Sequence, residues 1–98
     1  MKPVVWTDEA ESTCERLIAY LIHHNSKQEL EKVVSELERC IRLISQNPGL
    51  FALYQYSNRG ARKCVITKRC VMFYRDNDEF IEILGIYNTR QDLSSIDL

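Results

Sequence analysis

Basic side chains gather in one segment of this chain, where they could bind an anionic partner. The segment from residue 59 to residue 75 carries six basic residues and no acidic one: Arg59, Arg62, Lys63, Lys68, Arg69 and Arg75. Like charges on adjacent strands repel one another, so an anionic partner, either nucleic acid or an acidic protein segment, accounts for the cluster. The alternative is that these charges keep a sheet edge soluble and unpaired. The net charge of −1 conceals the segment because the first half of the chain is mildly acidic.

Tyrosines accompany the basic residues. Four of the five tyrosines lie in or near the basic segment: Tyr54, Tyr56, Tyr74 and Tyr87. A tyrosine beside an arginine suits base stacking combined with phosphate contact. Tyrosines are equally common in ordinary sheet packing, where aromatic side chains are enriched. The sequence therefore leaves both interpretations open.

Histidine and cysteine placement argues against a metal or redox centre. His23 and His24 are adjacent, so their side chains point in different directions and lack the spacing of metal ligands. The cysteines form no C-x-x-C pair, and we expect free thiols that act as small apolar groups in a reducing cytoplasm: Cys14, Cys40, Cys64 and Cys70. Three glycines are too few for a loop that cradles phosphates. We therefore expect no metal and no cofactor.

Chain length and hydropathy predict a single cytoplasmic domain over residues 1–98. A chain of 98 residues fits one domain and leaves no room for two. No apolar run approaches the ~20 residues that a membrane span needs. The opening residues are too few and too quickly followed by acidic residues to form a signal peptide. We therefore expect no membrane contact.

Two amphipathic helices are predicted in the first half of the chain. Thr7 is a typical N-cap, and the acidic turn after it favours a helix that ends near His23-His24-Asn25. Ser26 to Glu29 has the pattern of a capping box, and Asn47-Pro48-Gly49 ends the second helix. The short connection requires an antiparallel hairpin. We expect the two apolar stripes to be buried against a sheet at six positions: Leu17, Leu21, Val34, Leu37, Ile41 and Ile44.

Strand periodicity predicts an antiparallel sheet in the rest of the chain. Residues 51–56 are predicted as a strand or an extended segment, and residues 89–98, which show no clear pattern, as a mobile tail. The fold class is α+β: an N-terminal short strand, then an antiparallel helix hairpin packed on one face of a three- to four-stranded antiparallel sheet. The other face is expected to be at least partly open. Four segments are predicted as strands: 4–6, 61–67, 70–75 and 80–87.

Several segments, taken in order, carry a resemblance to a known family. Trp6-Thr7-Asp8-Glu9-Ala10 is similar to a strand-to-helix opening of the form W-[ST]-x-x-A, and residues 62–68 are similar to the family's first long strand. Residues 73–75 and 81–84 are similar to the family's last two strands, and residues 88–92 are similar to the R-x-D/N ending that follows them. From Val4 to Leu93, the chain resembles the RelE/ParE superfamily of toxins.

The resemblance implies a growth-inhibiting toxin of a type II toxin–antitoxin system, in one of two branches. RelE-like members cut mRNA on the ribosome, whereas ParE-like members inhibit DNA gyrase and are not nucleases. Cleavage needs a general base, a stabiliser of the scissile phosphate and a general acid. For that chemistry the resemblance offers four candidates: Arg62, Lys63, Tyr87 and Arg90.

Two departures from the nuclease pattern favour the gyrase inhibitor. The strand arginine of the nucleases, three residues before Tyr74, is replaced here by Val71. No tyrosine or histidine follows Tyr87, although the nucleases end in such a residue. Arg90 matches a basic position shared by both branches. A third interpretation is an inactive toxin relative that acts as a binding module.

The resemblance also implies a protein partner. This partner is a cognate antitoxin whose C-terminal segment wraps the toxin in a hetero-oligomer. Acidic residues of that segment are expected to meet basic residues on the open side of the sheet and at its end. The expected contact residues are Arg62, Lys63, Arg75, Arg90 and Tyr74.

Overall fold

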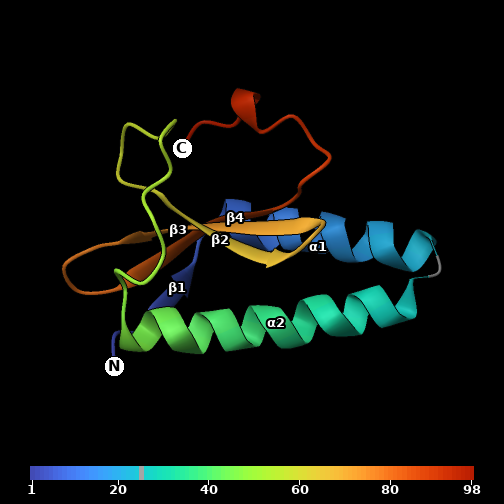
Figure 1. Ribbon diagram of the computed structural model, residues 1–98, viewed down its shortest axis with the longest axis horizontal. Coiled ribbons are helices and arrows are strands. Elements are labelled where there is room, and N and C mark those ends of the chain that lie inside the picture. The colour runs from blue at the N-terminus through green and yellow to red at the C-terminus, as the bar shows by residue number, and fades with distance from the viewer. Residues whose placement is uncertain (25) are drawn as a thin grey trace.

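The computed structural model describes residues 1–24 and 26–98, and it has two helices on one face of a four-stranded sheet (Figure 1). The strand order across the sheet is β1-β4-β3-β2. This arrangement confirms the predicted α+β class and the helix hairpin. The elements are β1 (Val4–Trp6), α1 (Asp8–His23), α2 (Lys27–Gln46), β2 (Arg62–Thr67), β3 (Cys70–Asp76), β4 (Ile81–Asn88) and a short 3-10 helix, η1 (Leu93–Ser95).

The sheet is mixed, whereas the sequence predicted an antiparallel one. β2, β3 and β4 form an antiparallel meander, as expected. β1 instead runs parallel to β4, with Val4 opposite Ile81 and Trp6 opposite Ile83. A parallel neighbour requires a long connection, and the helix hairpin and the meander supply it between β1 and β4. A three-residue strand pattern carries no information about this direction.

Thr7 joins the start of α1 to the sheet. Its Oγ1 accepts a hydrogen bond from the Ala10 backbone N–H at 3.0 Å, which confirms the predicted N-cap. The same hydroxyl donates to the Ile83 carbonyl in β4 at 2.8 Å. One side chain therefore both begins the helix and fixes where the helix leaves the sheet.

The predicted capping box at the start of α2 is wrong. Ser26 makes no side-chain cap bond, and its hydroxyl donates instead to the His24 carbonyl at 3.3 Å. Its backbone, with φ −100° and ψ 61°, lies outside the extended conformation that a capping residue adopts. Ser26 still occupies the N-cap position, and its carbonyl accepts from the Leu30 N–H at 2.9 Å, so α2 begins at the predicted place without the side-chain cap.

The helices bury most of the predicted stripe against one side of the sheet, here called the helix face. Leu17, Leu21, Leu37 and Ile44 are buried as predicted, and Ile41 is half-buried. The prediction that Val34 is buried is wrong, because its side chain is 41% exposed, whereas that of Val33 is 3% exposed. The buried positions of α2 recur at intervals of four, three and four residues, and Val34 lies ~100° around the helix from them. They are Val33, Leu37, Cys40 and Ile44.

Thr13 is a buried polar residue within this core. Its Oγ1 accepts a hydrogen bond from the Ile86 backbone N–H in β4 at 3.0 Å. The hydroxyl proton is directed to the Glu9 carbonyl, 2.8 Å away and one turn earlier in α1. Thr7 and Thr13 therefore hold α1 on β4 at two levels.

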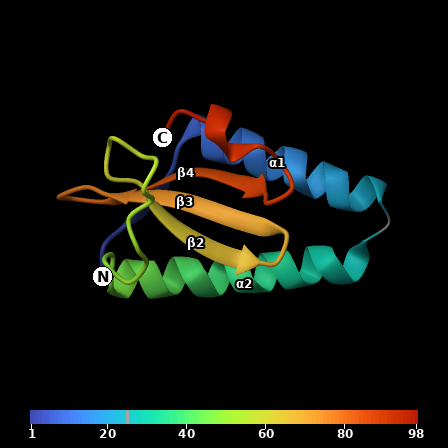
Figure 2. The same cartoon turned by 45° about the horizontal axis from the view of Figure 1, so that its top comes forward.

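The opposite side of the sheet, here called the loop face, is more covered than the sequence suggested. Residues 50–61 and the tail cross it (Figures 1 and 2). Residues 51–56, predicted as a strand or an extended segment, form no regular strand and make only an isolated bridge between Leu53 and Arg62. The loop curls so that its own backbone bonds to residues 61 and 63, and a regular ladder does not form. Beneath it lies a second buried cluster: Ala61, Val71, Phe73, Tyr87 and Leu98.

The tail is bound to the loop in this structure. The Ser57 hydroxyl donates to the Leu98 carbonyl, and Leu98 is buried. Arg59 pairs with the Asp97 carboxylate at 3.1 Å and also donates to the Asp97 carbonyl at 3.2 Å. The tail therefore has a defined position against the loop face, and its mobility in solution stays a prediction.

The cysteines are apolar core residues, as expected. All four are described, and all four are free thiols. Cys40, Cys64 and Cys70 are buried in the core under the helices. Burial raises the pKa of the Cys70 thiol to about 12, so this group stays protonated and unreactive at neutral pH.

Two positions of α2, one predicted correctly and one wrongly, provide the first test of the fold. Leu37→Ala removes a buried side chain and should lower the free energy of unfolding by ~2–5 kcal/mol. Val34→Ala removes an exposed one and should change it by less than ~0.5 kcal/mol. Urea unfolding measures both, and equal losses in the two variants would contradict the assigned helix face.

A second test concerns the bond between Thr13 and β4. Thr13→Val keeps the shape of the side chain but leaves the buried Ile86 N–H without an acceptor, which should cost ~1–3 kcal/mol. Ser12→Ala on the exposed side of α1 is the matched control and should be neutral within ~0.5 kcal/mol. A neutral Thr13→Val in the same urea titration would show that the bond does not hold α1 in place.

Candidate functional site

The predicted basic cluster is divided between the two ends of the sheet. Arg62 starts β2 opposite Tyr74, near the end of β3. The turn that carries Lys68 and Arg69 lies at the other end, next to Cys70. Tyr74 and Cys70 are four residues apart along β3, which is ~13 Å of strand. The six charges therefore do not form one surface.

Arg62 and Lys63 lie on opposite faces of the sheet. The Arg62 Nη1 donates to the Phe51 carbonyl at 2.8 Å on the helix face, the side on which Cys64 is buried. The Lys63 amine lies 5.8 Å from the centre of the Tyr54 ring on the loop face. Successive strand residues alternate between faces, so the prediction that both lie on the open side is wrong for Arg62.

Arg75 lies under the tail, at the edge of a cavity of about 520 Å³. Its Nε is 3.5 Å from Glu82 Oε1, and this nitrogen is buried without a hydrogen-bond partner among the described residues. Each arginine that lines the cavity faces a carboxylate, so the local charges nearly balance. The pairs are Arg75–Glu82, Arg59–Asp97 and Arg16–Glu9.

Tyr74 is a core residue, so the prediction that it contacts a partner is wrong. Its side chain is fully buried on the helix face, and its hydroxyl donates to the Pro48 carbonyl at 2.8 Å. Burial raises the pKa of this phenol. Phe51 packs edge-on against it, with ring centres 6.4 Å apart. The tyrosine therefore anchors the chain that follows α2 to the sheet.

Tyr87 is also largely buried, on the loop face. Its ring lies over Gly85, where a Cβ atom would come within 2.5 Å of the tyrosine ring and hydroxyl. Burial raises the pKa of the Tyr87 phenol, and the nearby Glu9 carboxylate raises it further. The hydroxyl therefore stays protonated at neutral pH, and Gly85 is required to accommodate the ring.

The candidates for nuclease chemistry are not brought together. Arg62 lies on the helix face where β2 begins, and Lys63 lies on the loop face. Tyr87 is 6% exposed. Arg90 follows the far end of β4, beyond the pair that Asn88 makes with Cys70. The four side chains are therefore divided between both faces and both ends of the sheet.

A second group of cations, each noted in the sequence but not predicted to lie together, gathers at that far end. Lys68, Arg69 and Arg90, here called the basic corner, come from the β2–β3 turn and the segment after β4. Thr89 joins these two segments: its N–H donates to the Arg69 carbonyl at 2.9 Å, and its hydroxyl donates to the Lys68 carbonyl at 2.8 Å. The signal was available in the sequence, because a tight β2–β3 turn must lie at the end where β4 finishes.

Among residues 1–24 and 26–98, no three His, Cys, Asp or Glu side chains are grouped so that they could hold a metal ion. Within the same residues, no helix has the length and apolar character needed to cross a membrane.

Comparisons with known proteins identify the family. A search of curated protein sequences gives no match. A solved structure described as "Chromosomal ParDE TA system from P. aeruginosa" superposes with a TM-score of 0.71, covering 90% of this chain and 96% of that one at 17% identity. At that identity the likeness concerns the fold alone. A family model described as "ParE toxin of type II toxin-antitoxin system, parDE" matches residues 4–93. Because the match covers nearly the whole chain, the protein belongs to the ParE toxin family of type II toxin–antitoxin systems.

Proposed function

We propose that this toxin arrests growth by inhibiting DNA gyrase and that it does not cut mRNA on the ribosome. The observation that carries the proposal is the separation of the four candidate nuclease residues, Arg62, Lys63, Tyr87 and Arg90, over two faces and two ends of the sheet. Cleavage of a phosphodiester requires the base, the acid and the phosphate stabiliser within hydrogen-bond reach of one substrate. Inhibition by binding has no such requirement.

The environments of individual residues support the same conclusion. Val71, which stands where the nucleases have an arginine, is fully buried under the loop face and has no charge to offer a phosphate. The Tyr87 hydroxyl stays protonated because burial raises its pKa, so it could not act as a base at neutral pH. The gyrase proposal also requires the cytoplasmic location that the sequence predicts.

We further propose that a cognate antitoxin binds the toxin in a hetero-oligomer and uses acidic residues against Lys63 and Arg75. Both cations lie on the loop face: Lys63 lies over the Tyr54 ring, and Arg75 lines the cavity that the tail helps to form. Lys63 is exposed and makes no ion pair with any described residue. Such an antitoxin segment would fold on binding and would need a long contact to offset its ordering entropy.

Tyr87→Phe separates the gyrase inhibitor from the nuclease. The substitution removes the hydroxyl and keeps the ring over Gly85, so gyrase inhibition should stay within about twofold of wild type. A nuclease that used this hydroxyl as its acid would lose ~10²–10⁴-fold in rate. Purified wild type and variant are compared in two assays, supercoiling by gyrase and cleavage of mRNA in ribosomes.

The antitoxin serves as the matched control, because the preformed complex should leave supercoiling intact. Ribosome-dependent cleavage by wild type that disappears in Tyr87→Phe would overturn the gyrase proposal in favour of the nuclease. Failure to inhibit either process, with no effect on growth, would identify an inactive relative that only binds.

Charge reversal at Lys63 tests the antitoxin surface. Lys63→Glu should weaken the complex, and the effect should shrink as salt rises because an exposed pair acts mainly through the association rate. Lys32→Glu on α2 changes the charge equally, at an exposed position away from the loop face. Surface plasmon resonance at two salt concentrations gives both rate constants. Equal association rates for the two variants would exclude Lys63 from the interface.

A further inference from the structure

The basic corner carries three charges that the rest of the fold does not neutralise. Four arginines elsewhere in the described residues face carboxylates, namely Arg16, Arg39, Arg59 and Arg75. The Arg62 guanidinium donates to a backbone carbonyl instead, and Arg42 on α2 makes no ion pair within the described part of the chain. Lys68, Arg69 and Arg90 make no ion pair with any described residue, and all three are exposed. Concentrated, unneutralised charge of one sign creates a field that attracts an anionic partner.

The backbone holds these cations close together. Besides the two bonds from Thr89, the Arg69 N–H donates to the Thr67 hydroxyl at 3.3 Å. The Arg90 N–H donates to Asn88 Oδ1 at 2.9 Å, which turns the chain sharply after β4. Like charges are therefore fixed side by side by hydrogen bonds that do not involve the charged groups themselves.

An exposed aromatic pair lies next to the corner, at the end of α1. The rings of Tyr20 and His24 stack with centres 4.1 Å apart and planes tilted by 31°. The His24 Nδ1–H donates to the Tyr20 carbonyl at 2.9 Å, which fixes the histidine ring. Tyr20 is 41% exposed, so the pair presents an aromatic surface to solvent.

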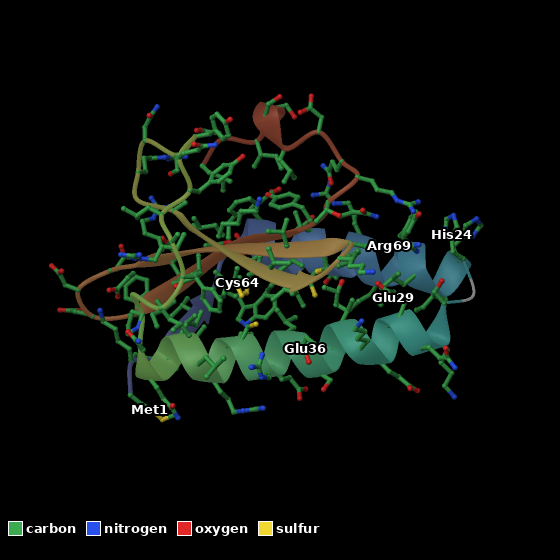
Figure 3. The ribbon with its side chains drawn as sticks, viewed as in Figure 1. Met1, His24, Glu29, Glu36, Cys64 and Arg69 are labelled. Carbon is green, nitrogen blue, oxygen red and sulfur yellow. The ribbon has the colours of Figure 1, made fainter. Side chains whose placement is uncertain are left out.

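A cavity of about 270 Å³ joins the aromatic pair to the cations. Both rings line it together with Arg69, Arg90 and Glu29. Figure 3 shows His24, Arg69 and Glu29 at the same end of the molecule. Glu29 is the one carboxylate of the lining, so the cavity keeps a net positive charge.

We infer that this cavity binds single-stranded nucleic acid, with the backbone phosphates on the basic corner and a base against Tyr20 and His24. Cations beside an exposed aromatic surface are the combination that single strands use: phosphates meet charge and unpaired bases stack. An acidic peptide would use the cations but would leave the aromatic surface without a stacking partner. A duplex keeps its bases stacked on one another and offers only its backbone. The inference does not depend on whether the toxin inhibits gyrase.

Fluorescence anisotropy with a labelled oligothymidine of ~12 nucleotides and a duplex of the same length tests the site. Arg69→Gln with Arg90→Gln should weaken single-strand binding at least tenfold and flatten its salt dependence, since phosphate contacts release counterions. The matched control, Lys32→Gln with Arg42→Gln on α2, removes the same charge and should stay within twofold. Tyr20→Ala should weaken binding at least fivefold, and Tyr20→Trp should restore it.

Removing a carboxylate from the cavity should strengthen single-strand binding, the opposite of removing an arginine. Glu29→Gln removes the one negative charge of the cavity and should tighten binding, whereas Glu31→Gln, exposed and outside the cavity, should not. Circular dichroism checks that each variant is folded. If Tyr20→Ala does not fold, Tyr20→Trp still tests the stacking site. Binding of the double arginine variant within twofold of wild type would overturn the site. Equal affinity for the duplex, or displacement of the oligonucleotide by an acidic peptide but not by unlabelled single strands, would overturn the assignment of its ligand.

Discussion

β3 is buried on both faces, and this constraint determines where the protein can carry charge. Five consecutive residues of the strand are almost inaccessible: Cys70, Val71, Met72, Phe73 and Tyr74. Cys70, Met72 and Tyr74 contribute to the core under the helices, and Val71 and Phe73 to the cluster under the loop and tail. An unpaired charge in either place would cost several kcal/mol, so basic side chains are confined to the ends of the strand. Arg69 lies just before the buried run and Arg75 just after it.

The two ends handle their charges in different ways. At the Arg75 end, the loop and the tail close over the sheet, and each arginine around the cavity faces a carboxylate. Partial burial makes the counter-charge of Glu82 necessary for Arg75, because a half-buried guanidinium without one is destabilising. The Arg16–Glu9 and Arg59–Asp97 pairs are exposed and contribute less. At the Arg69 end, the chain turns in solvent, so Lys68, Arg69 and Arg90 need no intramolecular partner. The cavity at the Arg75 end is thus nearly neutral and covered, and the basic corner at the other end is positive and open.

Much of the fold can be predicted from the sequence because short local patterns determine where the helices begin and end. Thr7 caps α1, and residues 47–49 end α2 as predicted. The wrong predictions occur where the local sequence fits two structures equally well and a contact with a distant part of the chain selects one of them. Val33 and Val34 both fit a helical stripe, and only the position of the sheet selects Val33. Similarly, a short apolar strand at residues 4–6 does not reveal whether β4 will run parallel or antiparallel to it.

The candidate site was predictable in composition but not in arrangement. The sequence drew attention to the basic segment and its tyrosines, but Tyr74 is a core residue and Arg62 and Lys63 lie on opposite faces. Strand alternation alone separates Arg62 from Lys63, so this error was avoidable from the sequence. The proximity of Lys68 and Arg69 to Arg90 likewise follows from the order of the meander. The Thr89 hydrogen bonds that hold the two segments together join residues distant in the chain, so no local pattern predicts them.

A sheet covered on both faces favours binding over catalysis in a domain of this size. Acid–base chemistry on a phosphodiester needs several polar groups to converge on one point, and the middle of an open sheet face is where adjacent strands can supply them. Here Val71 and Phe73 fill that position on the loop face, with Tyr87 packed beside them and Leu98 above. The polar groups that remain are dispersed around the rim, at opposite ends of β3. Such a rim can contact two large partners through separate surfaces, and this arrangement suits a toxin that must be held by an antitoxin and must also engage a target.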